Sequence, residues 1–162
     1  MSRTDAVPAA SRPVSVRLGV IIDAPVDTVF AAFTQWAEQG AWMLGTRVEV
    51  RVGDGRAVGS ELAAWTGAGP LGFWDTMVIT RWEPPVRVDV LHTGRVVKGT
   101  GTMEVLALPD DRSRFVWSEE LELPLGRLGR LGWPVARPAF LLGVRRSLEQ
   151  FGRLVEQGAL PR

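Results

Sequence analysis

The feature that most constrains this fold is the spacing of apolar residues over the middle of the chain. From residue 46 to residue 123, apolar and polar side chains alternate between short turn-forming segments, GDGR, GAGP, EPP, TGR and PDD. This pattern predicts six consecutive strands, near 46–52, 57–66, 71–83, 86–93, 96–108 and 112–123. Such short connections are typical of an antiparallel meander.

The segments that flank the meander predict one more strand and three helices. PVSVRLGVII, residues 13–22, alternates as a half-buried strand, and residues 24–36 follow with apolar side chains at helical spacing. A second short helix is expected near 36–41, and a long one over 134–157. Strands flanked by helices in this order favour an α+β domain with the helices on one face of the sheet.

Length and charge bound the class of protein. The 162 residues are expected to form a single domain, residues 14–158, after a disordered tail, residues 1–13. The tail lacks the apolar stretch of a signal peptide, and no apolar run reaches 18 residues, so we expect a cytoplasmic protein without a transmembrane segment. A net charge of +1 argues against nucleic acid as a partner.

Several chemistries are excluded by residue types that are absent or rare. Without cysteine there is no disulfide or thiolate, and a single histidine argues against a metal site. There is no tyrosine, and the one lysine, Lys98, is predicted on the outer face of its strand. The glycine-rich segments GDGRAVG and GAGPLG join strands rather than open a helix, so neither suits phosphate. We predict no cofactor and no metal.

The segment FVWSEELEL, residues 115–123, places a carboxylate in the apolar face of a strand. Trp117 and Leu121 share that face, and Glu119 lies between them. A three-residue PDD loop would set Gly101 of the preceding strand opposite Glu119. Because glycine in a strand often marks a close approach, the sequence predicts an unfilled space there, suited to a ligand unless the long helix fills it.

The role of Glu119 has three interpretations that the sequence leaves open. It forms an ion pair with an arginine of the long helix or of residues 126–130, it contacts a ligand, or it is an acid–base catalyst. His92, the only histidine, is expected on the same inward face. A two-residue turn at Gly94 and Arg95 would leave His92 and Glu119 about 16 Å apart, so a direct contact between them is not expected.

Whether Trp74 and Trp82 face inward depends on the length of the loop at EPP. A three-residue EPP loop would turn Trp74 and Trp82 inward, and we favour it because it sends charge outward. A two-residue loop would turn the alternate set inward: Asp75, Met77, Ile79 and Arg81.

Four segments carry a resemblance to a known superfamily. APVDTVFAAFTQW, RWEPPVRVDV, HTGRVVKGTGTMEV and RFVWSEELELP resemble the START-like (SRPBCC) superfamily, and within it the bacterial polyketide cyclase/dehydratase and lipid-transport group. The resemblance covers most of residues 14–157. It implies a helix-grip fold, in which a bent seven-stranded antiparallel sheet wraps around the long C-terminal helix and encloses a largely hydrophobic cavity.

The expected cavity gives a set of candidate site residues. Those expected to contact a ligand are Trp42, Trp74, Val90, His92, Gly101, Met103, Trp117, Glu119, Trp133, Phe140 and Val144. We expect a carrier or sequestering protein for a hydrophobic small molecule such as a lipid or a polyketide. The alternatives are a cyclase or dehydratase with Glu119 as base and His92 as proton donor, and a regulatory module that docks a protein partner.

Residues 124–146 form the one strongly basic stretch. Its arginines are Arg127, Arg130, Arg137, Arg145 and Arg146, with no acid among them. Glycine and proline predict a mobile loop before the helix proper. The stretch is either an entrance lid with weak contact to anionic lipid headgroups or an ordinary solvated loop.

Overall fold

The computed structural model describes residues 13–68, 70–122 and 127–161. The predicted tail therefore lies, except for Pro13, outside the described residues, as do the first residues of the basic stretch.

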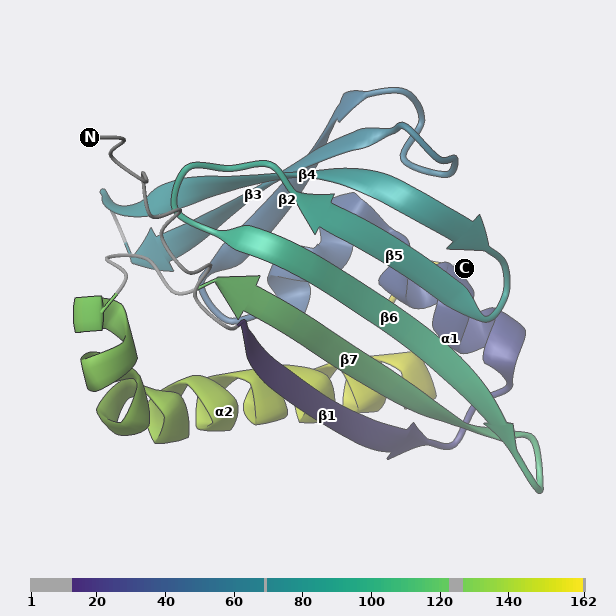
Figure 1. Ribbon diagram of the computed structural model, residues 1–162. Coiled ribbons are helices and arrows are strands. Elements are labelled where there is room, and N and C mark those ends of the chain that lie inside the picture. The colour runs from purple at the N-terminus through teal and green to yellow at the C-terminus, as the bar shows by residue number, and fades with distance from the viewer. Residues whose placement is uncertain (1–12, 69, 123–126, 162) are drawn as a thin grey trace, which may run out of the picture.

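Seven strands form one antiparallel sheet in the order β1-β7-β6-β5-β4-β3-β2 (Figure 1). They are β1 Val14–Ile22, β2 Thr46–Val52, β3 Glu61–Ala68, β4 Leu71–Glu83, β5 Arg87–His92, β6 Lys98–Leu108 and β7 Arg112–Glu122. The meander from β2 to β7 follows chain order, and β1 adds to the outer edge of β7. The predicted α+β helix-grip fold is confirmed.

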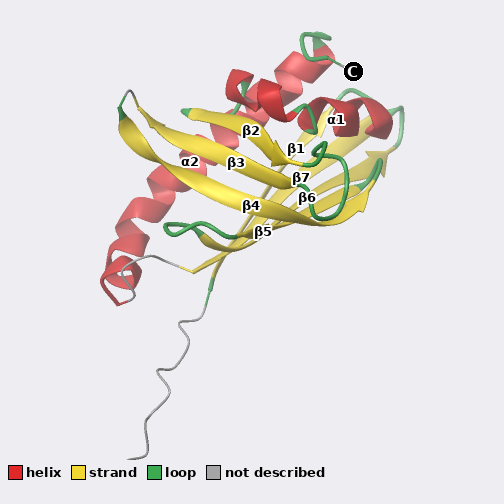
Figure 2. Ribbon diagram, turned by 90° about the horizontal axis from the view of Figure 1, so that it is seen from above, coloured by secondary structure: helices red, strands yellow, loops and turns green. Residues whose placement is uncertain are grey.

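The helices cover one side of this sheet (Figure 2). Two short ones follow β1, α1 Val26–Phe33 and the 3-10 helix η1 Trp36–Ala41, and the long α2 Arg127–Glu156 closes the chain. The prediction of a loop before residue 134 is wrong, because α2 already begins at Arg127. Pro134 and Pro138 lie inside the helix, and its first turns run at an angle to the rest (Figure 1), as proline in a helix predicts.

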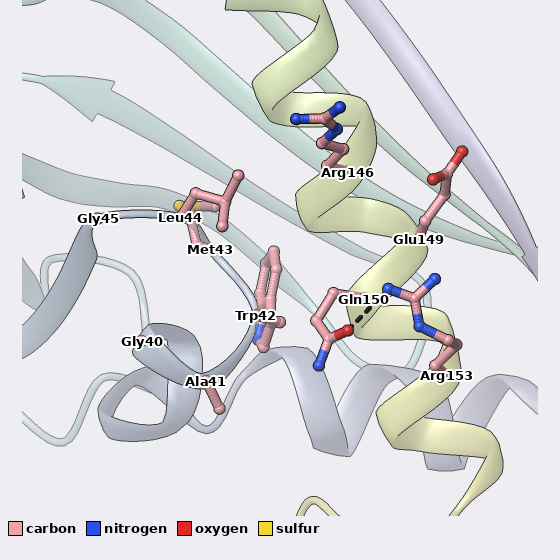
Figure 3. A pocket seen from close by; sticks show the side chains of 10 residues that line it. All are labelled: Gly40, Ala41, Trp42, Met43, Leu44, Gly45, Arg146, Glu149, Gln150 and Arg153. Atoms are coloured by element: carbon pink, nitrogen blue, oxygen red, sulfur yellow. Dashed lines mark hydrogen bonds between the residues drawn. The ribbon is translucent and has the colours of Figure 1, made fainter.

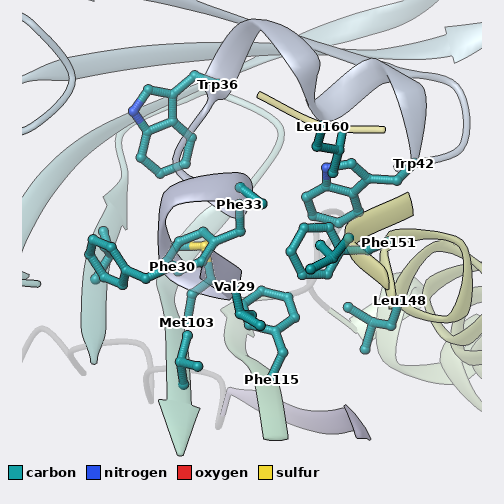
Figure 4. Packing of buried hydrophobic residues seen from close by; sticks show 14 of the residues in the cluster. Val29, Phe30, Phe33, Trp36, Trp42, Met103, Phe115, Leu148, Phe151 and Leu160 are labelled. Atoms are coloured by element: carbon teal, nitrogen blue, oxygen red, sulfur yellow. The ribbon is translucent and has the colours of Figure 1, made fainter. Parts of the chain in front are cut away.

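An aromatic core holds α1, η1 and α2 against the sheet (Figure 4). The ring of Phe115 in β7 lies 5.1 Å from that of Phe33 and 5.0 Å from that of Phe151, and all three side chains are fully buried. Trp42 packs on the other side of Phe151, with ring centroids 4.8 Å apart. Each such ring contributes about 2–3 kcal/mol by burial, so this cluster fixes the helices against the inner face of the sheet.

The strand registers bear out one predicted turn and correct another. Gly101 lies opposite Glu119 in the β6–β7 pair, as a three-residue loop at 109–111 predicts. In the β5–β6 pair the predicted register is wrong by two residues: His92 lies opposite Gly99 instead of Val97. The connection is longer than two residues because β6 begins only at Lys98. A shift of two leaves each side chain on its predicted face.

A bulge in β4 resolves the orientation of that strand. Ile79 pairs with Val90, but the next paired residue is Arg81, so Thr80 is an extra residue. Before Thr80 the inward residues include Asp75 and Ile79, and both are buried.

The predicted inward position of Trp74 is therefore wrong, whereas Trp82, beyond the bulge, does pack inward on Phe30 at 5.5 Å. Trp74 lies on the outer face against Trp65, where the guanidinium of Arg51 stacks on it 4.8 Å from the ring centroid.

Candidate functional site

A cavity of about 350 Å³ lies between the sheet, the η1–β2 region and α2. Most of its wall is apolar. The strands contribute Phe73, Met77, Val90, Met103, Trp117 and Leu121, and the β5–β6 connection contributes Val97. The helix α2 contributes Ala139, Phe140, Gly143, Val144, Ser147 and Leu148. Its volume falls within the usual range for small-molecule sites.

Three ionisable side chains converge on this apolar wall from three strands. The imidazole of His92 in β5 lies between two carboxylates, with Nδ1 2.8 Å from Oδ2 of Asp75 in β4 and Nε2 2.9 Å from Oε2 of Glu119 in β7. All three residues are buried, with exposed fractions of 8%, 8% and 7% for Asp75, His92 and Glu119. Since both ring nitrogens are engaged, the imidazole has no free nitrogen for a further partner.

The contact between His92 and Glu119 corrects the expected separation of about 16 Å. His92 pairs with Gly99, which pairs with Leu121, so Glu119 lies two residues along and two strands over. In a flat sheet this corresponds to about 12 Å between Cα atoms, a distance that two facing side chains span.

Gly101 makes the room for this contact, because it stands between Val90 and Glu119 without a side chain. A Cβ there would lie 2.9 Å from Oε1 of Glu119 and 2.9 Å from Cγ2 of Val90. The predicted space beside Glu119 is thus occupied by its own carboxylate.

The environment makes this cluster retain protons. Burial alone would lower the pKa of His92, but the hydrogen bonds and charges of Asp75 and Glu119 outweigh it and raise the pKa to about 10. Burial also raises the pKa of Glu119, which the hydrogen bond from His92 opposes. Imidazolium is therefore the form of His92 at neutral pH.

Asp75 is the site residue that the favoured sequence interpretation missed. Its side chain was placed inward only by the alternative turn at EPP, and the signal for that alternative was the apolar alternation of Met77 and Ile79 on the same face. Oδ2 of Asp75 accepts from His92, whereas Oδ1 is buried without a hydrogen-bond partner.

The structure brings most of the predicted ligand-contacting residues to the cavity. Those that line it are Trp42, Val90, His92, Met103, Trp117, Glu119, Phe140 and Val144. Gly101 lies directly under the Glu119 carboxylate. Trp74 lies on the opposite face of the sheet, and Trp133 stands outside the wall and contacts Phe140, with ring centroids 5.6 Å apart.

An arginine partner for Glu119 was one of the three interpretations, and in the described part of the chain the partner is His92 instead. The side chains of Arg127 and Arg130, which were among the candidates, lie outside that part. No arginine or lysine is among the described residues that line the cavity.

A more open groove lies on the other side of residues 42–44 (Figure 3). It runs between residues 40–45 and Arg146, Glu149, Gln150 and Arg153 of α2. Trp42, Met43 and Leu44 line both the groove and the cavity, so this short segment separates them. It is tied to α2 by the backbone N–H of Leu44, which donates to Oγ of Ser147 at 3.1 Å.

The first half of α2 carries exposed apolar side chains. Leu131 and Val135 are exposed by 77% and 82%. The predicted lid or lipid contact of residues 124–146 stays a prediction.

None of the helices in the described ranges combines the length and hydrophobicity of a membrane span. Nor do the described residues include a group of three histidine, cysteine or acidic side chains placed to hold a metal ion.

A bent antiparallel sheet gripping a long C-terminal helix over an internal cavity defines a START-like, helix-grip protein. Residues 13–156 match the family model described as polyketide cyclase / dehydrase and lipid transport, and the chain belongs to that family. No protein with a curated description matches the sequence significantly.

Solved structures share the fold at low sequence identity. The Thermus thermophilus protein TTHA0849 is 15% identical, with a TM-score of 0.76 over 90% of this chain and 99% of that one. The Chromobacterium violaceum protein CV1439 is 19% identical, with a TM-score of 0.66 over 89% and 99%. Norcoclaurine synthase of Thalictrum flavum, in complex with dopamine and hydroxybenzaldehyde, is 13% identical, with a TM-score of 0.68 over 97% and 96%.

Proposed function

We propose that this protein binds a hydrophobic small molecule in the cavity between sheet and α2, as a carrier or sequestering protein. The observation that carries the proposal is an apolar, aromatic-rich cavity of about 350 Å³ inside a member of a lipid-transport and cyclase family. Burial of an apolar ligand there is favourable by about 25 cal/mol per Å² of apolar area removed from water. A protein of the same fold holds two aromatic small molecules.

Native mass spectrometry of the freshly purified protein, followed by extraction and identification of released compounds, tests this function. A defined hydrophobic adduct, or saturable uptake of an apolar probe such as methylnaphthalene, supports it. A clean apo mass without uptake of lipid or aromatic probes contradicts it.

A glycine that lines the cavity offers a sharper version of the test. A Cβ at Gly143 would meet no atom within 4 Å, so Gly143→Leu is expected to fill part of the cavity and to block uptake without unfolding the protein. Gly132→Leu is the matched control, because Gly132 is also helical and unobstructed but lies outside the cavity wall. Equal uptake by both variants would place the ligand elsewhere.

A second candidate function, a cyclase or dehydratase, is favoured by the buried Asp75–His92–Glu119 cluster. In this reaction Glu119 would remove a proton from the carbon next to a ligand carbonyl, with His92 retaining its hydrogen bond to the carboxyl as the proton arrives. The test is deuterium exchange at the α-carbon of an apolar aryl ketone in D₂O, followed by NMR. Exchange above the solvent rate that Glu119→Gln abolishes supports catalysis, and solvent-level exchange in the wild type contradicts it for this class of ketone.

A further inference from the structure

The cluster of Asp75, His92 and Glu119 is short of hydrogen-bond donors. Two ionised carboxylates offer four oxygens, and an imidazolium has two N–H groups. His92 donates one to Oδ2 of Asp75 and one to Oε2 of Glu119. Oδ1 of Asp75 is buried without a partner, and Oε1 of Glu119 has no hydrogen bond to any residue in the described ranges.

The same cluster carries an excess of negative charge. When His92 is imidazolium and both carboxylates are ionised, the cluster has a net charge of −1, and none of the described lining residues is an arginine or lysine. Uncompensated charge in an apolar cavity is costly, so the site favours a proton or another cation. His92 has no free nitrogen, and Oδ1 of Asp75, although unpaired, is fully buried. The group of the cluster that remains to meet a ligand is therefore the second oxygen of Glu119.

The surrounding rings suit a cation as well as a hydrocarbon. Trp117, in the strand of Glu119, faces Phe140 of α2, with ring centroids 6.4 Å apart, and both line the cavity together with Phe73. Aromatic faces attract ammonium groups, the more so away from water.

We propose that the ligand of this cavity is a hydrophobic amine whose ammonium group binds at Glu119, with its apolar body against Trp117 and Phe140. This inference rests on the proposed binding function and names its ligand class. Ammonium supplies up to three N–H donors and one positive charge, the two things that the cluster lacks. A ligand with a buried carboxylate, such as a fatty acid bound head first, would add a second uncompensated charge and is excluded by the same reasoning.

The test is calorimetric titration of the full chain at pH 7 with four probes of one shape: naphthylmethylamine, naphthylmethanol, methylnaphthalene and naphthoate. We expect the amine to bind at least tenfold more tightly than the alcohol and the hydrocarbon, and the carboxylate to bind most weakly. Equal affinities, or tightest binding of the carboxylate, would overturn the inference and leave the binding function standing. Failure of all four probes to bind would overturn the binding function for aromatic ligands together with the inference.

Two isosteric variants distinguish the effect of the Glu119 charge on ligand preference from the effect of a charge outside the cavity. Glu119→Gln is expected to remove the preference for the amine while methylnaphthalene still binds. Glu120→Gln removes the same charge from the adjacent, exposed residue on the outer face and is expected to keep the preference. A preference that survives Glu119→Gln contradicts the assignment to Glu119. If that variant does not fold, the ranking of the four probes on the wild type decides alone.

Discussion

Nε2 of His92 lies 2.9 Å from Oε2 of Glu119, although their strands, β5 and β7, are separated by β6. The contact crosses β6 beside Gly101, where a Cβ would lie 2.9 Å from Oε1 of Glu119 and would force the carboxylate to shift. An acid–base pair inside an apolar cavity thus depends on a residue that contributes no chemistry of its own.

Gly101→Ala is expected to displace the Glu119 carboxylate from His92, because the new Cβ would lie 2.9 Å from Oε1. NMR titration of the only histidine should show the pKa of His92 falling below its wild-type value of about 10. The free energy of unfolding should fall by about 1–3 kcal/mol, as for other overpacked sites.

Gly132→Ala is the control for this substitution, since its Cβ meets no atom within 4 Å, and it should stabilise α2 by up to about 1 kcal/mol. An unchanged His92 titration in Gly101→Ala would show that the carboxylate has room elsewhere.

The stability of the protein should decrease as pH rises above neutrality. The pKa of His92 is raised from 6.5 to about 10, so between these values the folded state holds a proton that the unfolded chain has released. The contribution of His92 is complete below pH 6.5 and is lost as pH rises through about 10. The raised pKa of Glu119 also makes stability fall as pH rises, over the range in which Glu119 titrates. No titratable residue of α2 is among the described lining of the cavity.

Urea denaturation at pH 7 and pH 9.5 measures this effect, with a slope of at most about 1.4 kcal/mol per pH unit for one proton. The chain has one lysine and no tyrosine or cysteine, so few other side chains titrate in this window. His92→Gln should show a shallower slope than the wild type. Equal slopes would mean that His92 titrates near its ordinary value.

Trp36→Phe is expected to destabilise the protein by about 1–3 kcal/mol. The indole N–H of Trp36 donates to the buried carbonyl of Gly55 at 2.7 Å, and phenylalanine would leave that oxygen unpaired. Trp82→Phe is the matched control, because Trp82 is half-buried and makes no hydrogen bond to the described residues. Thermal or urea unfolding should rank Trp36→Phe below Trp82→Phe, and the reverse order would contradict the importance of this bond.

Phe140→Ala is expected to weaken binding of methylnaphthalene about tenfold with little effect on stability. Phe140 is only half-buried and faces Trp117 across the cavity, so its ring mainly contacts the ligand. Val135→Ala, on the exposed face of the same helix, should leave the affinity unchanged. Titration of both variants checks this, and an equal loss in both would indicate a general effect on α2.

The alternation of residues predicted the sheet well because side-chain direction depends only on whether a register is odd or even. The predicted β5–β6 register is wrong by two residues, and yet His92 still lines the cavity and Gly101 still lies beside Glu119, as expected. Distances along the strand, however, do change with the register. The shift of two residues reduced the separation of His92 and Glu119 from one that forbids contact to one that permits it. The length of the turn after His92, which turn-forming residues do not specify uniquely, decided that outcome.

The inward position of Asp75 and the start of α2 are two other features that the sequence pattern did not predict correctly. Regular alternation allows either Asp75 or Trp82 to face inward, and the bulge at Thr80 lets both do so. Glycine and proline in residues 124–146 indicated a loop before residue 134, but α2 already begins at Arg127 and continues through Pro134 and Pro138.

The bulge at Thr80 also separates β4 into two halves, in each of which a different alternate set of side chains faces inward. On one side of the bulge Asp75 lines the cavity, and on the other side Trp82 packs in the aromatic core. Inward and outward positions exchange at the bulge. An insertion or deletion of one residue at this point would therefore change which side chains face inward in one half of β4 and leave the other half as it is. The residues of β4 that line the cavity can therefore change while those that pack in the aromatic core stay the same.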